Sequence, residues 1–144
     1  IIKQARSDLG IQVPIIGGDG LDSPKLVEIA GASNMDKVFI TNHYAADDPD
    51  PRIQEFVKEY QAKYNAIPDA FAVLGYDAVM LYADAVNRAG STDPTEVKAA
   101  LEAMKDLPLV SGTITIGPDH NPIKAAVVLE YVDGKQTFRK KVEP

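Results

Sequence analysis

The first third of the chain alternates helical and strand-like segments, and this order restricts the fold more than any other feature of the sequence. Residues 1–9 have the pattern of a helix closed by a glycine, and residues 11–16 form a short apolar run. That run ends in the glycine-rich stretch 17–20, as expected of a buried parallel strand with a tight exit loop. A capped helix over 24–30 and a second strand over 37–42 follow. Helices alternating with buried strands predict an α/β fold, with a parallel sheet and flanking helices.

The middle of the chain is predicted to be helical. From Ile53 to Tyr64 apolar residues recur at helical spacing, which indicates one amphipathic face. A longer helix over 70–88 carries apolar residues nearly all round, so we expect most of its circumference to be buried. Asp93 and Pro94 begin a third helix as N-cap and first helical residue.

The end of the chain is predicted to be strands. Residues 111–116 and 125–132 are β-branched or alternate between apolar and polar. Asp133-Gly134 is a typical hairpin turn and leads into a last strand over 136–142.

Composition excludes several classes of function. The 144 residues carry a formal net charge of −6, dispersed along the chain without a basic stripe, so neither nucleic acid nor an anionic membrane surface is an expected partner. Cysteine is absent, and so are a nucleophile elbow and a Walker sequence; we therefore predict no enzyme, no cofactor and no metal site. His43 and His120 lack metal-ligand spacing and are expected to be solvated loop residues.

Five segments carry a resemblance to a known family. They are Gly17-Gly18-Asp19-Gly20, Tyr44 before an acidic loop, Pro68-Asp69-Ala70-Phe71, Gly75-Tyr76-Asp77-Ala78, and the stretch 111–124. Together they resemble the leucine/isoleucine/valine-binding protein family over nearly the whole chain. The resemblance implies the fold of a type I periplasmic binding protein, in which three strands join two flavodoxin-like α/β lobes and the ligand lies between them.

Length and chain start suggest that the sequence is part of a longer protein. Family members are more than twice as long, and the chain begins at Ile1 inside what reads as an uncapped helix. We therefore expect a C-terminal fragment, with any signal peptide upstream. The resemblance implies a second lobe over 1–42, a hinge crossing over 43–50, a first lobe over 51–108, a second crossing over 109–124, and a terminal hairpin over 125–144 that returns to the second lobe.

Asp19 is the main candidate for ligand binding. It follows a predicted strand, at the edge where open α/β sheets bind ligands, and Gly18 lets a ligand approach the backbone closely. A carboxylate is a suitable acceptor for an α-ammonium group, and the resemblance implies that role. The alternative is that Asp19 only shapes the turn or caps the next helix.

Two aromatic residues are further candidates. Phe71 matches a family position whose ring lines the apolar pocket, although an ordinary core aromatic on a buried helix has the same pattern. Tyr76 is a ligand candidate by its motif, with the alternative that it packs the helix and finds a hydroxyl partner near the hinge. Tyr44, beside the first crossing, is a weaker candidate.

The function implied by the resemblance is that of the solute-binding component of an ABC-type amino-acid uptake transporter. Its ligand would be a branched-chain or other apolar amino acid, and its partners the permease subunits in the membrane. Its location would be the periplasm, or the extracellular face in a lipid-anchored form. A sensory or regulatory domain of the same fold is the alternative, and an α/β enzyme would require a nucleophile or phosphate loop that the sequence lacks.

Overall fold

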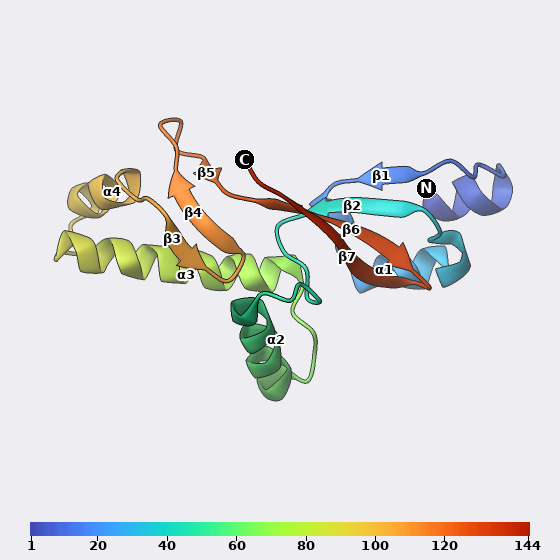
Figure 1. Cartoon of the computed structure of the whole chain (residues 1–144), viewed down its shortest axis with the longest axis horizontal. Helices are drawn as coiled ribbons and strands as arrows, with labels where there is room; N and C mark the ends of the chain where they lie inside the picture. Colours follow the sequence, from blue (N-terminus) through green and yellow to red (C-terminus); the bar gives the residue numbers. More distant parts are fainter.

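The computed structural model describes all 144 residues, which fold into two bodies joined by crossing segments (Figure 1). One is a mixed sheet with helices, here called the sheet body. The other, here called the helical body, contains three helices and a small three-stranded sheet. The sheet body holds β1 (Ile15–Gly17), β2 (Val38–Asn42), β6 (Ala126–Val132) and β7 (Lys135–Val142), with α1 (Pro24–Ala30); the helical body holds α2 (Pro51–Tyr64), α3 (Ala70–Ala89), α4 (Pro94–Glu102), β3 (Leu107–Leu109), β4 (Gly112–Ile116) and β5 (Pro122–Ile123).

The sheet body confirms the predicted α/β order but corrects the predicted strand direction. β1 and β2 are parallel, whereas β6 pairs antiparallel with β2 and β7 antiparallel with β6. The predicted hairpin, whose Asp133 and Gly134 have φ values of 50° and 75°, makes β7 antiparallel to β6, and β6 itself enters the sheet from the helical body in the direction opposite to β2. Alternate residues of β2 and β6 face a core that is closed by Met35 and α1. The sheet is therefore parallel only where the chain crosses over through α1.

The first predicted strand is shorter than expected. Only Ile15–Gly17 pair with β2, although the apolar run begins at residue 11. The carbonyls of Ile11 and Val13 accept hydrogen bonds from Arg6 Nη1 at 2.6 and 2.8 Å instead. Arg6 belongs to the first helical segment, which has π-helical geometry over Gln4–Asp8. A buried arginine therefore takes the carbonyls that a longer strand would have paired.

The helical body confirms the predicted helices and adds two short strands. Each of the three helices begins after an aspartate whose carboxylate accepts a backbone N–H of the first turn: Asp50, Asp69 and Asp93. Strands β3 and β5 were not predicted, and both pair antiparallel with β4. They span three and two residues, which is too short for a periodic signal.

The prediction that α3 is buried around most of its circumference is wrong. Val73 and Ala85 on one side are fully buried, but Phe71 and Val79 are 64% and 67% exposed. α2, α4 and β3 cover one side of the helix, and no other segment of the 144 residues covers the opposite side. No helix, α3 included, is long and apolar enough to cross a membrane.

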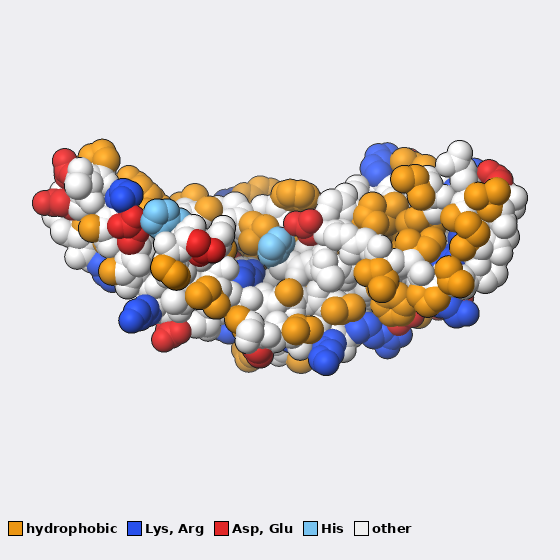
Figure 2. All heavy atoms as spheres, turned by 90° about the horizontal axis from the view of Figure 1, so that it is seen from above, with side chains coloured by type: hydrophobic (Ala, Val, Ile, Leu, Met, Phe, Trp, Pro, Cys, Tyr) orange, Lys and Arg blue, Asp and Glu red, His pale blue; other side chains and the backbone are white.

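The exposed side of α3 predicts self-association of the 144-residue chain. A second exposed apolar region, around Ile11, Val13 and Ile16, lies on the sheet body, and the view from above shows hydrophobic side chains gathered there (Figure 2). Contiguous apolar surface of this kind tends to be covered by a partner. Sedimentation velocity at tens of micromolar should show dimers or larger species. Val79→Glu should raise the monomer fraction, and a stable monomer in the unaltered chain would contradict the expectation.

Candidate functional site

Asp19 lies at the carboxyl end of β1, where it begins a 3-10 turn that extends to Leu21. The turn is closed by the backbone, since the Asp22 N–H donates to the Asp19 carbonyl at 2.8 Å. Gly18 precedes the turn in extended conformation, and the Asp19 side chain caps no backbone N–H. The carboxylate is 54% exposed at the edge of the parallel strand pair. The capping alternative therefore has no support in the geometry, and the carboxylate is open to a ligand.

His43 is a partly exposed loop residue, as the sequence predicted, and it lies beside Asp19. It follows β2 as Asp19 follows β1, and parallel strands bring their carboxyl ends to one edge. Its Nε2 is 3.1 Å from Asp19 Oδ2. The His43 backbone N–H donates to Asn42 Oδ1 at 2.8 Å. The pairing of residues 24 apart depends on strand register, which no local sequence signal reports.

Asp22 is a buried carboxylate that connects the two bodies. It is 8% exposed, and its Oδ2 accepts hydrogen bonds from Asn42 Nδ2 at 2.9 Å and from the Ala70 backbone N–H at 3.0 Å. Its Oδ1 accepts from Gln136 Nε2 at 2.6 Å. Ala70 is the first residue of α3, so the carboxylate also satisfies one of the unpaired N–H groups at the start of that helix. Sequence reasoning did not single out Asp22, because its partners are up to 114 residues away.

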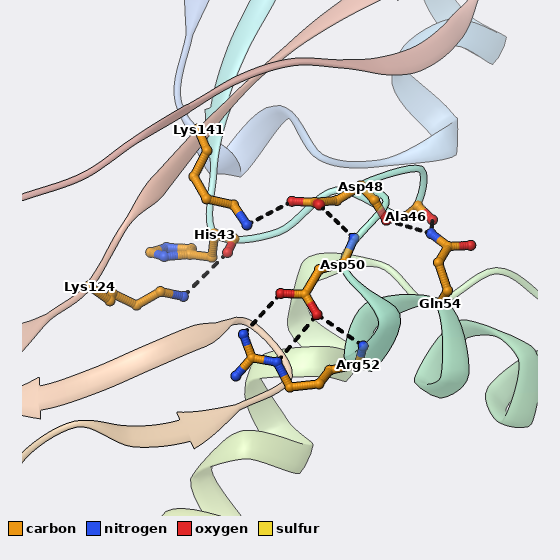
Figure 3. A network of polar contacts seen from close by, with 8 residues as sticks. All are labelled: His43, Ala46, Asp48, Asp50, Arg52, Gln54, Lys124 and Lys141. Atoms are coloured by element: carbon orange, nitrogen blue, oxygen red, sulfur yellow. Dashed lines mark hydrogen bonds and ion pairs between the residues drawn. The ribbon is translucent and has the colours of Figure 1, made fainter.

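Asp77, on α3, is a second buried carboxylate, and its partners lie within the helical body, in the turn between β3 and β4. Its two carboxylate oxygens accept the backbone N–H groups of Val110 and Ser111 at 2.9 and 2.8 Å. Lys124 donates to Ser111 Oγ at 2.7 Å. It also donates to the His43 carbonyl, just after β2, at 3.3 Å (Figure 3). Burial lowers the pKa of Lys124, and the nearby Asp77 carboxylate opposes that shift. These contacts hold the turn between β3 and β4 to α3 and, through Lys124, to the segment that follows β2.

The segment 45–50 is held from both bodies (Figure 3). Lys141 Nζ, on β7, lies 3.0 Å from Asp48 Oδ2, and Gln54 Nε2, on α2, donates to the Ala46 and Asp48 carbonyls. The contact with Lys141 is an ion pair without hydrogen-bond geometry, since Asp48 Oδ2 has no hydrogen-bond donor. Hydrogen bonding to Arg52 lowers the pKa of the Asp50 carboxyl below its ordinary value. The first crossing is therefore anchored at both ends.

The two aromatic candidates occupy different places. Phe71 is exposed on the first turn of α3, next to the Ala70 N–H that contacts Asp22, so it does not have the core position that was its alternative. Tyr76 is 46% exposed, and its hydroxyl makes no hydrogen bond, which contradicts the expected hydroxyl partner. Its ring packs at 5.0 Å from Phe56 and lines a groove of about 350 Å³ between α2, α3 and β3. Neither Asp19 nor Phe71 lines this groove, so the structure does not bring Tyr76 together with them.

Tyr44 is buried, so its side chain is not open to a ligand and instead holds the segment after β2 in place. Its hydroxyl donates to the Pro68 carbonyl at 2.6 Å. Burial raises the pKa of Tyr44 well above its ordinary value, and the carboxylates of Asp22 and Asp69 raise it further. Because the folded state binds this proton more tightly than the unfolded state, the stabilising contribution is complete below about pH 10 and is lost at higher pH.

Tyr44→Phe should therefore make the protein less sensitive to alkali. At neutral pH the variant should lose about 1 kcal/mol of unfolding free energy, because the Pro68 carbonyl loses its donor. Between about pH 8 and about pH 11, its stability should fall less than that of the unaltered protein. Urea unfolding at several pH values measures both effects. Tyr82→Phe, at an exposed position, is the control; equal alkaline slopes for all three proteins would contradict the prediction.

Comparison with known proteins gives a consistent result. Residues 1–136 match the model of a family described as periplasmic binding protein. The Leu/Ile/Val-binding protein homolog 2 of Brucella abortus is 31% identical over 150 residues, which cover 98% of this chain and 38% of that protein. A solved structure of a leucine binding protein from Thermotoga maritima is 35% identical with a TM-score of 0.89. The match covers 99% of this chain and 41% of that protein. The branched-chain amino acid transporter substrate binding protein LivJ of Streptococcus pneumoniae was solved with isoleucine. It is 33% identical with a TM-score of 0.87, and the match covers 99% of this chain and 40% of that protein. The chain thus spans about two fifths of the length of these relatives.

Proposed function

The chain belongs to the periplasmic binding protein family, and from that premise we propose that it is part of the solute-binding component of an ABC-type amino-acid uptake transporter. Its relatives include substrate-binding proteins of branched-chain amino acid transporters, and one of them was solved with isoleucine. The family consists of binding proteins, which agrees with the expectation that the chain is not an enzyme. The proposed partners are a free amino acid and the permease of the transporter, and the proposed location is the periplasm or the extracellular face.

The proposed ligand is an amino acid, probed first with leucine, isoleucine and valine. The single observation that carries this proposal is the Asp19 carboxylate, which is exposed at the strand edge, caps nothing, and has no lysine or arginine as partner. A carboxylate in that state attracts a ligand ammonium group. Gly18 leaves the backbone beside it accessible, and Phe71 offers an exposed aromatic ring for an apolar side chain.

The proposed lobes follow the two bodies. Residues 1–42 and 125–144 would form one lobe and 51–108 the other, with crossings at 43–50 and 109–124. Three separate hydrophobic clusters support this division: the one around Met35 and Ile40 lies in the first of these lobes, and those around Val73 and around Ala85 lie in the other. Within 109–124, strand β4 pairs with β3 and with β5, and Lys124, which donates to Ser111, also donates to the His43 carbonyl of the other crossing. A ligand that touches both lobes stabilises only the closed form, which is how occupancy would be communicated to a permease.

A thermal-shift panel tests the proposal. The intact gene product that carries these residues is mixed with each of the common amino acids, and a ligand that binds only the folded state raises the midpoint of unfolding. We expect leucine, isoleucine or valine to give the largest rise, and aspartate and lysine to give none. No rise with any amino acid would refute the proposed function. The analogous carboxylic acids without an amino group serve as the matched control for the role of Asp19.

A further inference from the structure

The Asp19–His43 contact has a consequence for ligand binding. His43 Nε2, 3.1 Å away, is the sole side-chain partner of the Asp19 carboxylate in the structure. Both side chains are about half exposed, at 41% for His43 and 54% for Asp19, so the contact is accessible to a molecule that arrives from solvent. A ligand ammonium group that binds Asp19 would therefore meet a carboxylate already paired with an imidazole.

The position of His43 is set by its backbone. Its N–H donates to Asn42 Oδ1. Its carbonyl accepts a hydrogen bond from Lys124 Nζ (Figure 3). Asn42 is in turn held by the buried carboxylate of Asp22 at 2.9 Å. These contacts fix the main chain at the start of the first crossing, while the exposed ring can turn about its side-chain bonds. The imidazole is therefore presented to Asp19 and is free to leave it.

We propose that His43 is a further residue of the ligand site, and that its imidazole competes with the α-ammonium group of the ligand for the Asp19 carboxylate. The inference rests on the proposed function, because it requires Asp19 to receive an ammonium group. When the ligand binds, the His43–Asp19 hydrogen bond breaks and an ammonium–carboxylate contact forms in its place. The binding free energy then includes the difference between the free energies of these two contacts. Any change that strengthens the His43–Asp19 contact therefore weakens ligand binding.

Protonation of His43 strengthens the first contact. A histidine side chain gains its charge between about pH 8 and about pH 5, and the charged ring both pairs more strongly with Asp19 and repels the ligand ammonium. The charged groups around it are Asp19 on the turn after β1, Lys124 in the second crossing, and Asp22 behind Asn42. Lys124 contacts the carbonyl rather than the ring, and Asp22 is occupied by three donors, so Asp19 is the one carboxylate open to the imidazole. Affinity should therefore fall as the solution becomes more acidic.

Calorimetric titration of the intact gene product with leucine, isoleucine and valine, between about pH 5.5 and about pH 8, tests the inference. At about pH 5.5 the ligand has to displace a charged His43 from Asp19. The free energy of such an exposed ion pair corresponds to a loss of about three- to fivefold in affinity relative to about pH 8. His43→Gln removes the titratable ring and keeps the backbone contacts, so its affinity should change less than about twofold over the same range. His120→Gln is the control, because that histidine pairs with Glu102 on the helical body, and this variant should keep the slope of the unaltered protein.

The outcomes separate the inference from the proposed function. A flat affinity profile in the unaltered protein, the same slope in His43→Gln, or tighter binding at acid pH would overturn the competition while leaving amino-acid binding in place. Absence of binding at every pH would refute the proposed function and the inference with it. Thermal midpoints of the variants show whether a lost slope comes from the site or from unfolding.

Discussion

Asp22→Ala should destabilise the protein by about 3–5 kcal/mol, because it removes the acceptor for two buried donors and one partly buried donor at once. Asn42 Nδ2, the Ala70 N–H and Gln136 Nε2 all donate to this carboxylate, and they come from both bodies. Each donor left without a partner costs free energy, since water that enters the small gap cannot satisfy all three. A loss of this size is a large fraction of the stability of an ordinary domain.

Asp22→Asn is the matched control, with an expected loss of about 1 kcal/mol. The amide oxygen can replace Oδ2 toward Asn42 and Ala70, and Gln136 can turn its own amide so that its oxygen accepts the new N–H group. Urea unfolding of the intact gene product measures both variants. If Asp22→Ala loses less than about 1 kcal/mol, Asp22 is not the connection between the two bodies that its contacts indicate.

Asp19→Ala should have the largest effect on ligand affinity. If Asp19 pairs with the ligand ammonium inside a closed cleft, removal of one partner of that buried pair costs about 2–5 kcal/mol, which is about 30-fold to several-thousand-fold in dissociation constant. Asp19→Asn keeps the shape and one acceptor without the charge, and should fall between. Asp8→Ala, at an exposed acid on the same body, controls for the change in net charge.

Stability separates the two possible roles of Asp19. If Asp19 only shapes the turn, replacing it should lower the unfolding free energy by about 1 kcal/mol and leave ligand affinity unchanged. In the structure the backbone closes the turn and the Asp19 side chain caps nothing, so we expect its replacement to cost little stability. Affinity within about threefold of the unaltered protein, together with lowered stability, would end the binding role of Asp19.

Local signals predicted most of the elements. Ser23, Asp93 and the other caps mark helix starts through contacts two or three residues away, and Gly10 and Gly90 have the positive φ expected just after a helix. Such signals carry no information on what covers an element. For that reason the prediction for α3 was wrong: its apolar circumference is visible in the sequence, whereas its exposure depends on which other segments lie nearby.

The site was predicted in part. Asp19 and Gly18 could be found because the end of a strand and the glycine-rich turn lie together in the sequence, and their role in binding stays a prediction. His43, Asp22 and Asp77 have their effect through contacts 20 to 114 residues away in sequence, which depend on strand register and on the packing of the two bodies. The Gly-Tyr-Asp-Ala motif pointed to the right helical turn but to Tyr76, whereas the neighbouring Asp77 makes the buried contacts.

The central claim is that the protein recognises an amino acid by its ammonium group at Asp19. Calorimetric titration with leucine and with 4-methylpentanoate, which is leucine without its amino group, tests it most directly. We expect leucine to bind with a micromolar or lower dissociation constant and 4-methylpentanoate to bind about 100-fold more weakly or not at all, because 4-methylpentanoate lacks the ammonium group that pairs with the Asp19 carboxylate. Equal affinity for the two compounds, or no binding of leucine, isoleucine or valine in the same titration, would contradict the account.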